Sequence, residues 1–152
     1  MTRLNIRDSS VMAQKALNIK LMLIDCDGVL SRATFTFGYN GEETRVFSIR
    51  DQLGIEILQE KSGIDVVLIS EERTTPFLNY ALKLKLSDQY LGIIKTEKLL
   101  EELCLKYNLN PSQIAYVGDE IDDLALMKAV GFTACPLDAV HEVRAQADYV
   151  CS

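Results

Sequence analysis

Two groups of acidic residues in this sequence are spaced for chemistry. Asp25 and Asp27 stand two residues apart, and Gly28 after them permits a sharp bend. A second group directly follows Gly118 and has four members, Asp119, Glu120, Asp122 and Asp123. If the fold brings the two groups together, their like charges require a cation between them. Oxygen ligands without histidine favour magnesium over zinc. The alternative interpretation is that these acids only form turns, in which Asp and Gly are common.

Asp25 and Asp27 together suit the transfer of a phosphoryl group. A carboxylate beside Mg²⁺ can attack phosphorus and form an aspartyl-phosphate, which divides one difficult displacement into two easier ones. The cation offsets the repulsion between that carboxylate and the phosphate oxygens. A second acid can protonate the leaving alcohol and later activate a water molecule. We therefore expect Asp25 to be the nucleophile and Asp27 to be the acid–base residue.

Both acidic groups follow apolar runs that are typical of strands buried on both faces. Such runs span residues 20–25, 65–70 and 113–118, and shorter ones span 90–94, 132–135 and 149–151. Helical patterns lie between them, at residues 55–61, 77–86, 97–109, 124–130 and 141–147. This alternation predicts an α/β fold, an open parallel sheet flanked by helices.

One insertion interrupts the alternation, at about residues 33–49. Its two β-prone runs, residues 35–37 and 45–49, flank Asn40-Gly41, a strong signal for a hairpin. An insertion directly after the first strand would lie over the carboxyl ends of the strands, where open α/β sheets bind ligands. We expect the whole chain, residues 1–152, to form one domain that carries this hairpin.

The composition excludes several classes of partner. With a net charge of −6 and no basic stripe, the chain is not expected to bind nucleic acid. Residues 1–19 are polar and predict a leader or a short helix, and no segment has the apolar length of a signal peptide or a membrane span. The four cysteines have no metal-binding spacing and indicate reduced thiols, so we expect a cytoplasmic protein.

Three segments resemble motifs of the haloacid dehalogenase superfamily of phosphatases. Residues 25–30 (DCDGVL) are similar to its first motif, DxDGxx, and residues 118–123 (GDEIDD) to its fourth, GDDxxD. Ser70, at the end of a buried run, matches the serine or threonine of its second motif. The resemblance implies a Rossmann-like fold, a magnesium cofactor, and a Ser70 that holds the transferred phosphoryl group. It also implies three magnesium ligands, Asp25, Asp119 and the backbone carbonyl of Asp27. Glu120 and Asp123 would support these ligands.

A narrower resemblance runs without obvious gaps from about residue 20 to residue 150. Residues 41–55 look like the NGEExKxFxxRDGxGI segment of the small-hairpin phosphatases. That group acts on 3-deoxy-manno-octulosonate 8-phosphate or on nine-carbon, sialic-acid-type 9-phosphates, in sugar-acid and lipopolysaccharide biosynthesis. The phosphatase-like C-terminal domain of acylneuraminate cytidylyltransferases is similar as well. The resemblance implies a phosphorylated sugar acid as substrate, a homotetramer assembled through the hairpin, and Arg50 as a substrate-binding residue.

The sequence departs from this family at the third motif, which supplies a lysine that neutralises the nucleophile and the phosphate. The family lysine falls on Thr96, and Lys95 and Lys98 flank it. Because a lysine stem is long and flexible, we expect Lys95 to serve after a shift of one residue. The alternative is that both lysines are solvated residues at the start of a helix.

Two further departures concern specificity and activity. Glu72 stands where the octulosonate enzymes have arginine, and Lys83 follows eleven residues later, as in the nine-carbon enzymes. A reversed charge beside the substrate predicts a preference for a nine-carbon 9-phosphate, unless this is only an exposed charged loop. The family also continues with a Gly-Gly-x-Gly segment beyond the position of Cys151. A weak or inactive relative that serves assembly or regulation therefore stays open as the alternative function.

Overall fold

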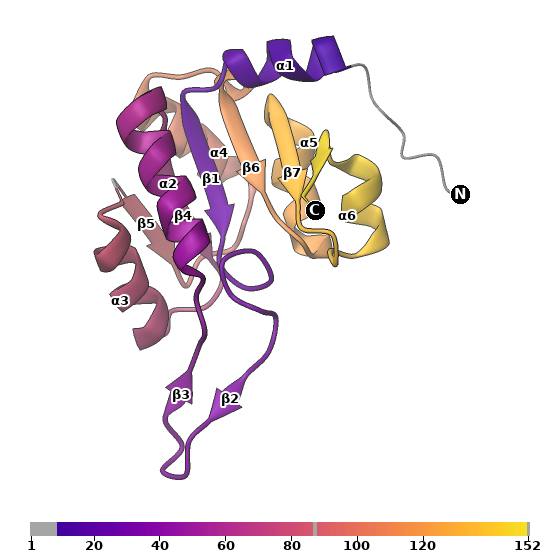
Figure 1. Ribbon diagram of the computed structural model, residues 1–152. Helices are drawn as coiled ribbons and strands as arrows, with labels where there is room; N and C mark the ends of the chain where they lie inside the picture. Colours follow the sequence, from indigo (N-terminus) through magenta and orange to yellow (C-terminus); the bar gives the residue numbers. More distant parts are fainter. Residues whose placement is uncertain (1–8, 87, 152) are drawn as a thin grey trace.

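Six parallel strands form the main sheet of the protein, in the order β5-β4-β1-β6-β7-β8 (Figure 1). The structure is a computed structural model, and it describes residues 9–86 and 88–151. The strands are β1 (Leu21–Asp25), β4 (Asp65–Ser70), β5 (Asp88–Leu91), β6 (Ile114–Val117), β7 (Phe132–Cys135) and β8 (Tyr149–Val150). The open α/β fold expected from the sequence is confirmed, with the two strands that carry the acidic groups side by side in the middle.

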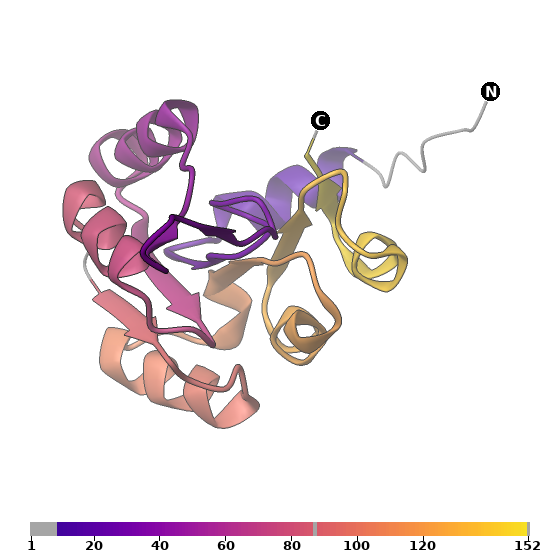
Figure 2. The same ribbon diagram turned by 90° about the horizontal axis from the view of Figure 1, so that it is seen from below.

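Helices cover both faces of the sheet (Figure 2). On one face lie α2 (Ile49–Ser62) and α3 (Thr75–Leu84). The other face carries α4 (Glu97–Tyr107), α5 (Leu124–Ala129) and α6 (His141–Gln146). The remaining helices are α1 (Ser9–Leu17) and the 3₁₀ turns η1 (Pro111–Gln113) and η2 (Ile121–Asp123). No helix among the described residues is long and apolar enough to pass through a bilayer.

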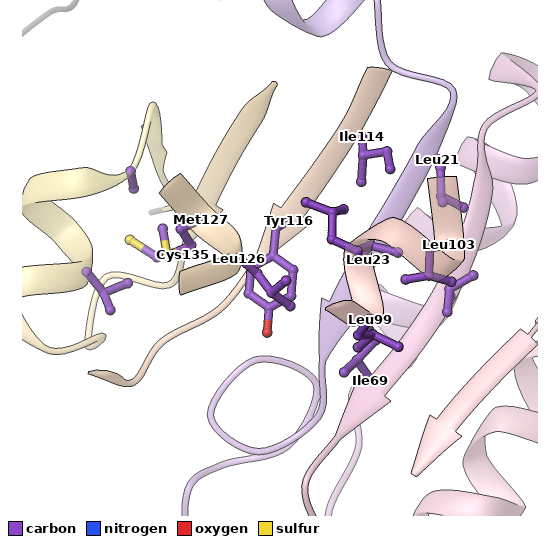
Figure 3. Packing of buried hydrophobic residues seen from close by; sticks show 14 of the residues in the cluster. Leu21, Leu23, Ile69, Leu99, Leu103, Ile114, Tyr116, Leu126, Met127 and Cys135 are labelled. Carbon is purple, nitrogen blue, oxygen red and sulfur yellow. The ribbon is translucent and has the colours of Figure 1, made fainter. Parts of the chain in front are cut away.

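The central strands are apolar on both faces, which explains their continuous apolar runs. In β1, Leu21 and Leu23 pack on the face covered by α4 and α5, whereas Ile24 packs on the face covered by α2 and α3. Figure 3 shows the first of these cores, in which Tyr116 lies among leucines of the helices with its hydroxyl directed out of the cluster. The two cores hold β1 and β6 firmly, so the loops after these strands start from fixed points.

The insertion forms the expected antiparallel hairpin, with strands β2 (Thr36–Phe37) and β3 (Glu43–Thr44). Gly41 lies in its turn with a φ of 81°, a left-handed conformation that glycine adopts without strain. The hairpin projects from the edge of the sheet toward which the β1 arrow points (Figure 1).

The prediction of a strand at residues 45–49 is wrong, because β3 ends at Thr44 and α2 begins at Ile49. The Ser48 hydroxyl accepts a hydrogen bond from the Arg50 N–H at 3.1 Å, and this N-cap starts the helix six residues earlier than the apolar spacing indicated. One bridge between Ser31 and Phe47 is what remains of extended pairing there. The other boundaries agree within three residues, with β5 ending at Leu91 because Gly92 turns the chain at a φ of 76°. Part of the expected N-terminal leader, residues 1–8, lies outside the described residues.

Replacement of Gly131 by alanine is expected to destabilise the fold. Gly131 connects α5 to β7, and a Cβ built there would lie 2.2 Å from the backbone oxygen of Ser112. Relieving that overlap should lower the free energy of unfolding by about 1–3 kcal/mol, measured by denaturant titration. Gly54 supplies the matched control, because it is exposed in α2 and nothing lies within 4 Å of its added Cβ. Gly54→Ala should raise the free energy of unfolding by about 0.5–1 kcal/mol, and equal effects of the two changes would contradict this account.

Candidate active site

The carboxyl ends of the adjacent strands β4, β1 and β6 form one cavity. Asp25 ends β1, Ser70 ends β4, and Asp119 follows β6 by two residues. The cavity has a volume of about 150 Å³ and is lined by Asp25, Asp27, Ala33, Ser70, Glu71, Glu72, Lys95, Asp119, Glu120 and Asp122. The two acidic groups therefore meet at this edge of the sheet, together with Ser70.

Lys95 supplies the positive charge of the cavity. Its side chain is only 5% exposed, and its ammonium lies 3.0 Å from Asp25 Oδ1, 2.8 Å from Asp123 Oδ1 and 3.2 Å from Asp122 Oδ2. Lys98, by contrast, is exposed in the first turn of α4. Thr96, at the position of the family lysine, is the N-cap of α4, and its hydroxyl accepts the Leu99 N–H at 3.4 Å. The structure thus places Lys95, and not Lys98, beside the expected nucleophile.

Asp123 is fully buried and organises the loop after β6. Its Oδ1 accepts hydrogen bonds from the Tyr116 hydroxyl at 2.5 Å and from Lys95 at 2.8 Å. Its Oδ2 accepts the N–H groups of Asp119 at 2.7 Å and of Glu120 at 3.0 Å. With four donors on its two oxygens, Asp123 holds the loop in place while Asp119 lines the cavity. Sequence reasoning missed Tyr116, although a lone aromatic residue with a hydroxyl in an aliphatic strand was a signal.

Glu120 has a local contact of its own. Its carboxylate accepts the Ile121 N–H at 3.0 Å and so caps η2, at the rim of the cavity. Its supporting role toward a metal, expected from the sequence, stays a prediction.

The carboxyl groups of Asp25 and Asp119 both have raised pKa values. Burial raises the pKa of Asp25 to about 8, with Lys95 lowering it and Asp123 raising it further. Burial is also the main cause that raises the pKa of Asp119 to about 7, and the charge of Asp123 adds to it. Near neutral pH, without a cation, these two groups therefore tend to hold protons, as expected for like charges gathered in a poorly solvated cavity.

The carboxylates fit a hard divalent cation. One oxygen each from Asp25, Asp119 and Asp123 lies within 4.8 Å of the others. Asp119 Oδ1 is buried and has no hydrogen-bond partner among the described residues, which is costly unless an ion binds it. Asp119 lies against Gly28, whose φ is 82° and whose added Cβ would be 1.7 Å from Asp119 Oδ2. Ligands that are all oxygen suit magnesium.

Asp27 is contacted by a residue that sequence reasoning did not single out. Its Oδ1 accepts a hydrogen bond from Arg45 Nη1 at 2.6 Å and another from the Ser31 hydroxyl at 3.3 Å. Arg45 also forms an ion pair with Glu72 at 3.0 Å. Burial raises the pKa of the Asp27 carboxyl, and the charge of Arg45 opposes that rise.

The three residues expected to bind substrate are not all at the cavity. Glu72 lines it, and the Glu72 N–H donates to the Ser70 hydroxyl at 3.0 Å. Lys83 lines a neighbouring groove of about 470 Å³ between the hairpin, α2 and α3. Arg50 is exposed in the first turn of α2, outside both hollows as the described residues line them. Glu72 and Lys83, which the sequence pattern had paired, therefore line different but neighbouring hollows.

Comparisons with known proteins agree with this geometry. A family model described as haloacid dehalogenase-like hydrolase matches residues 92–152. The 3-deoxy-D-manno-octulosonate 8-phosphate phosphatase of Yersinia pestis is 35% identical over 139 residues, which are 90% of this chain and 73% of the relative. The enzyme of the same name from Escherichia coli strain B / BL21-DE3 is 36% identical over 146 residues, 93% of this chain and 74% of the relative.

The chain belongs to the 3-deoxy-D-manno-octulosonate 8-phosphate phosphatase family. The family is one of haloacid dehalogenase-like phosphoric monoester hydrolases, as the motifs at the strand ends indicated.

Solved structures of this family have the same fold. The 3-deoxy-D-manno-octulosonate 8-phosphate phosphatase of Moraxella catarrhalis was solved in complex with magnesium, phosphate and 3-deoxy-D-manno-octulosonate (KDO). It superimposes with a TM-score of 0.89 at 29% identity, and the match covers 96% of this chain and 83% of the Moraxella chain. The cobalt-bound Haemophilus influenzae phosphatase has a TM-score of 0.85 at 31% identity, over 91% of this chain and 81% of its own. Divalent metals are thus bound in these two relatives, in agreement with the magnesium expected from the oxygen ligands.

Removal of Lys95 is expected to abolish most phosphatase activity, whereas removal of Lys98 is not. Lys95→Met takes the only basic side chain of the described lining from the cavity, so turnover should fall by about a hundredfold or more. Lys98→Met changes an exposed charge on the same helix start and should alter turnover by less than about twofold. Steady-state hydrolysis of p-nitrophenyl phosphate measures both, with thermal unfolding as the check that each variant is folded. A large loss in the Lys98 variant would contradict the assignment.

Magnesium should stabilise the protein more at pH 8 than at pH 6. Because the folded-state pKa values of Asp25 and Asp119 lie above their unfolded values, the metal-free protein loses stability as pH rises from about 4 through 7 and 8. Magnesium needs the ionised carboxylates, so its binding opposes that loss and strengthens with pH. Melting temperatures with and without Mg²⁺ test this, with Asp119→Asn expected to weaken the magnesium effect at both pH values. An equal stabilisation at pH 6 and pH 8 would show that other groups bind the metal.

Proposed function

We propose that this chain is a magnesium-dependent phosphatase that hydrolyses 3-deoxy-D-manno-octulosonate 8-phosphate through an aspartyl-phosphate on Asp25. One observation carries the proposal: a buried carboxylate, Asp25, lies 3.0 Å from the Lys95 ammonium in a cavity that Asp119 also lines. One buried oxygen of Asp119 has no hydrogen-bond partner among the residues that the structure describes. The relatives named for this activity match the chain over nine-tenths of its length, which supports 3-deoxy-D-manno-octulosonate 8-phosphate as the substrate.

The charge of the cavity supports the need for a cation. Of the described residues that line it, Lys95 alone is basic, and seven are acidic, namely Asp25, Asp27, Glu71, Glu72, Asp119, Glu120 and Asp122. A phosphate dianion would be repelled by such a lining. Asp25, Asp119 and the backbone carbonyl of Asp27 are the groups that would hold magnesium. The ion, when bound, neutralises part of the charge on the carboxylates and the phosphate.

In the first half of the reaction, Asp25 attacks phosphorus. An Asp25 carboxylate oxygen forms the new O–P bond while the bond from phosphorus to the sugar oxygen breaks. The Lys95 ammonium lies 3.0 Å from Asp25, opposes the rise that burial causes in the pKa of its carboxyl group, and holds that group in place. A bound cation would favour the ionised form further. The Ser70 hydroxyl lines the cavity and can donate to a phosphoryl oxygen. Asp27 gives a proton to the departing sugar oxygen.

In the second half, water releases the phosphoryl group. Asp27, now a carboxylate, takes a proton from a water molecule as that water attacks phosphorus, and the bond between Asp25 and phosphorus breaks. The products are inorganic phosphate and the free sugar acid, and both aspartates return to their starting states. Asp27 thus serves as acid and then as base, which requires that it stay in one place through both steps.

A nine-carbon 9-phosphate is the second candidate substrate. The observation that favours it is the carboxylate of Glu72 at the cavity, since a carboxylate accepts hydrogen bonds from sugar hydroxyls. Against it, Glu72 is already paired with Arg45, and Lys83 lines a different hollow. Kinetics on both sugar-acid phosphates, with Glu72→Gln as the variant, decide between the two substrates.

Assembly through the hairpin is proposed as well. The hairpin displays three exposed aromatic side chains, Phe35 at 58%, Phe37 at 64% and Tyr39 at 103%, and the start of α2 adds the exposed Ile49 and Leu53. Such a surface favours packing against another subunit, which supports the homotetramer that the family resemblance implies. A cytoplasmic location and a part in lipopolysaccharide biosynthesis stay expectations of the same kind.

Substitution of Asp25 tests the proposed chemistry. Asp25→Asn should lower turnover of 3-deoxy-D-manno-octulosonate 8-phosphate by more than about a thousandfold, because an amide oxygen does not attack phosphorus. Labelled substrate should phosphorylate the wild-type protein and leave Asp25→Asn unlabelled. Glu101→Gln is the control, because Glu101 is exposed on α4 and does not line the cavity, and it should keep wild-type turnover.

Two results would refute the proposal. Turnover by Asp25→Asn close to that of the wild type would remove the nucleophile. A folded, magnesium-saturated wild type that hydrolyses neither sugar-acid phosphate nor p-nitrophenyl phosphate would favour the alternative, a relative without catalysis.

A further inference from the structure

Arg45 is buried although it stands at the base of an exposed hairpin. It directly follows β3, yet its side chain is only 1% exposed. Its guanidinium forms ion pairs with carboxylates from three parts of the chain, at 2.6 Å from Asp27, 2.7 Å from Glu43 and 3.0 Å from Glu72. It also donates to the backbone oxygen of Thr34 at 3.3 Å. All three nitrogens of the guanidinium are therefore engaged.

Two aromatic rings contact this guanidinium. Its central carbon lies 4.2 Å from the ring centre of Phe35 and 5.1 Å from that of Phe77. Phe77 is fully buried in the core between the sheet and α3, so one side of the guanidinium rests on a rigid part of the fold. Cation–π contacts of this kind favour arginine over lysine and restrict the movement of the guanidinium group. Arg45 is thus a fixed donor and not a mobile surface charge.

This donor determines which oxygen of Asp27 is free. Arg45 and the Ser31 hydroxyl both donate to Oδ1 of Asp27, at 2.6 and 3.3 Å. Bridges from Asp27 to Ser31 and from Ser31 to Phe47 fasten the same loop to the hairpin. Both donors that contact Asp27 among the described residues are on Oδ1. The other oxygen, Oδ2, is therefore the one that can carry a proton within the cavity.

Arg45 is poorly suited to bind the substrate itself. Its single positive charge faces three carboxylates, so no net positive charge is left for an anionic sugar. Its buried nitrogens would have to give up existing hydrogen bonds to contact a ligand, which is expensive at a buried site. The contacts therefore favour an action through Asp27.

We propose that Arg45 is a positioning residue for the acid–base steps: it fixes Oδ1 of Asp27 so that Oδ2 transfers the protons. This rests on the proposed function. As the bond between phosphorus and the leaving oxygen breaks and the bond from Asp25 to phosphorus forms, the proton on Oδ2 passes to the leaving oxygen. When water attacks phosphorus, its proton returns to Oδ2 and the Asp25–phosphorus bond breaks. Without Arg45 only the longer contact from Ser31 holds Oδ1, so the carboxyl group is less restricted and both transfers become slower.

Leaving groups of different basicity test the proposal. In Arg45→Gln, turnover of an alkyl phosphate, which needs a proton on its leaving oxygen, should fall by about a hundredfold. The first release of nitrophenolate from p-nitrophenyl phosphate needs no such proton and should slow by less than about threefold. Later turnovers need Asp27 as the base, so nitrophenolate should appear in a burst of one equivalent per site, resolved by rapid mixing.

Two further variants complete the experiment. Arg45→Lys keeps a charge and most of the packing, so it should fold even if the glutamine variant does not, with a loss on the alkyl phosphate of about tenfold. Arg32→Gln removes an exposed arginine from the loop after Asp27 and should match the wild type on both substrates.

Some outcomes would overturn the proposal. Equal losses on both substrates in a folded Arg45 variant would assign a purely structural role, and an unchanged rate on the alkyl phosphate would assign none. Failure of the proposed function gives a different result, because the unsubstituted protein then forms no phosphoryl-enzyme and Asp25→Asn keeps its activity.

Discussion

The burial of Lys95 among carboxylates is the interaction on which the site depends. Asp25 is 4% exposed and Asp123 is fully buried, and a buried charge without a partner costs several kcal/mol. The Lys95 ammonium, within 3.2 Å of three carboxylates, compensates for part of this cost and ties the loop after β5 to β1 and η2. One ammonium does not balance all the acids of the cavity. Burial is the main cause that raises the pKa values of Asp25 and Asp119, and the charge of Asp123 adds to it. The negative charge that Lys95 leaves uncompensated favours the binding of a cation.

Carboxylates of one residue type have different tasks here because their hydrogen-bond donors differ. Asp123 accepts four donors and has no oxygen to spare, so it orders the loop. Asp119 keeps a buried oxygen without a partner among the described residues, which suits a metal ligand. Asp27 has its donors on one oxygen, which suits proton transfer by the other. The number of donors on each oxygen therefore distinguishes the roles proposed for these three aspartates more clearly than position in a motif does.

The hairpin contributes to the site as well as to the surface. Its base is anchored on α3, where the rings of Phe47 and Tyr80 stack with centres 3.9 Å apart. Arg45 reaches from that base to Asp27, the proposed acid–base residue, while the aromatic side chains toward the tip are exposed. A subunit that packs on the tip would restrict the strands that carry Arg45. The proposed assembly surface and the proposed proton transfer therefore involve the same short insertion.

The sequence by itself determined the parallel sheet, the hairpin and the meeting of the two acidic groups. Buried parallel strands appear as continuous apolar runs, and acids at the ends of such strands share one edge. Local periodicity does not report which charges pair after the chain has closed. Only the tertiary structure showed that Lys95, and not its neighbour Lys98, lies beside Asp25, and that Glu72 and Lys83 line different hollows. Arg45 was not foreseen, because its partners Asp27 and Glu72 are 18 and 27 residues away along the chain, and an arginine in a polar hairpin carries no local sign of burial.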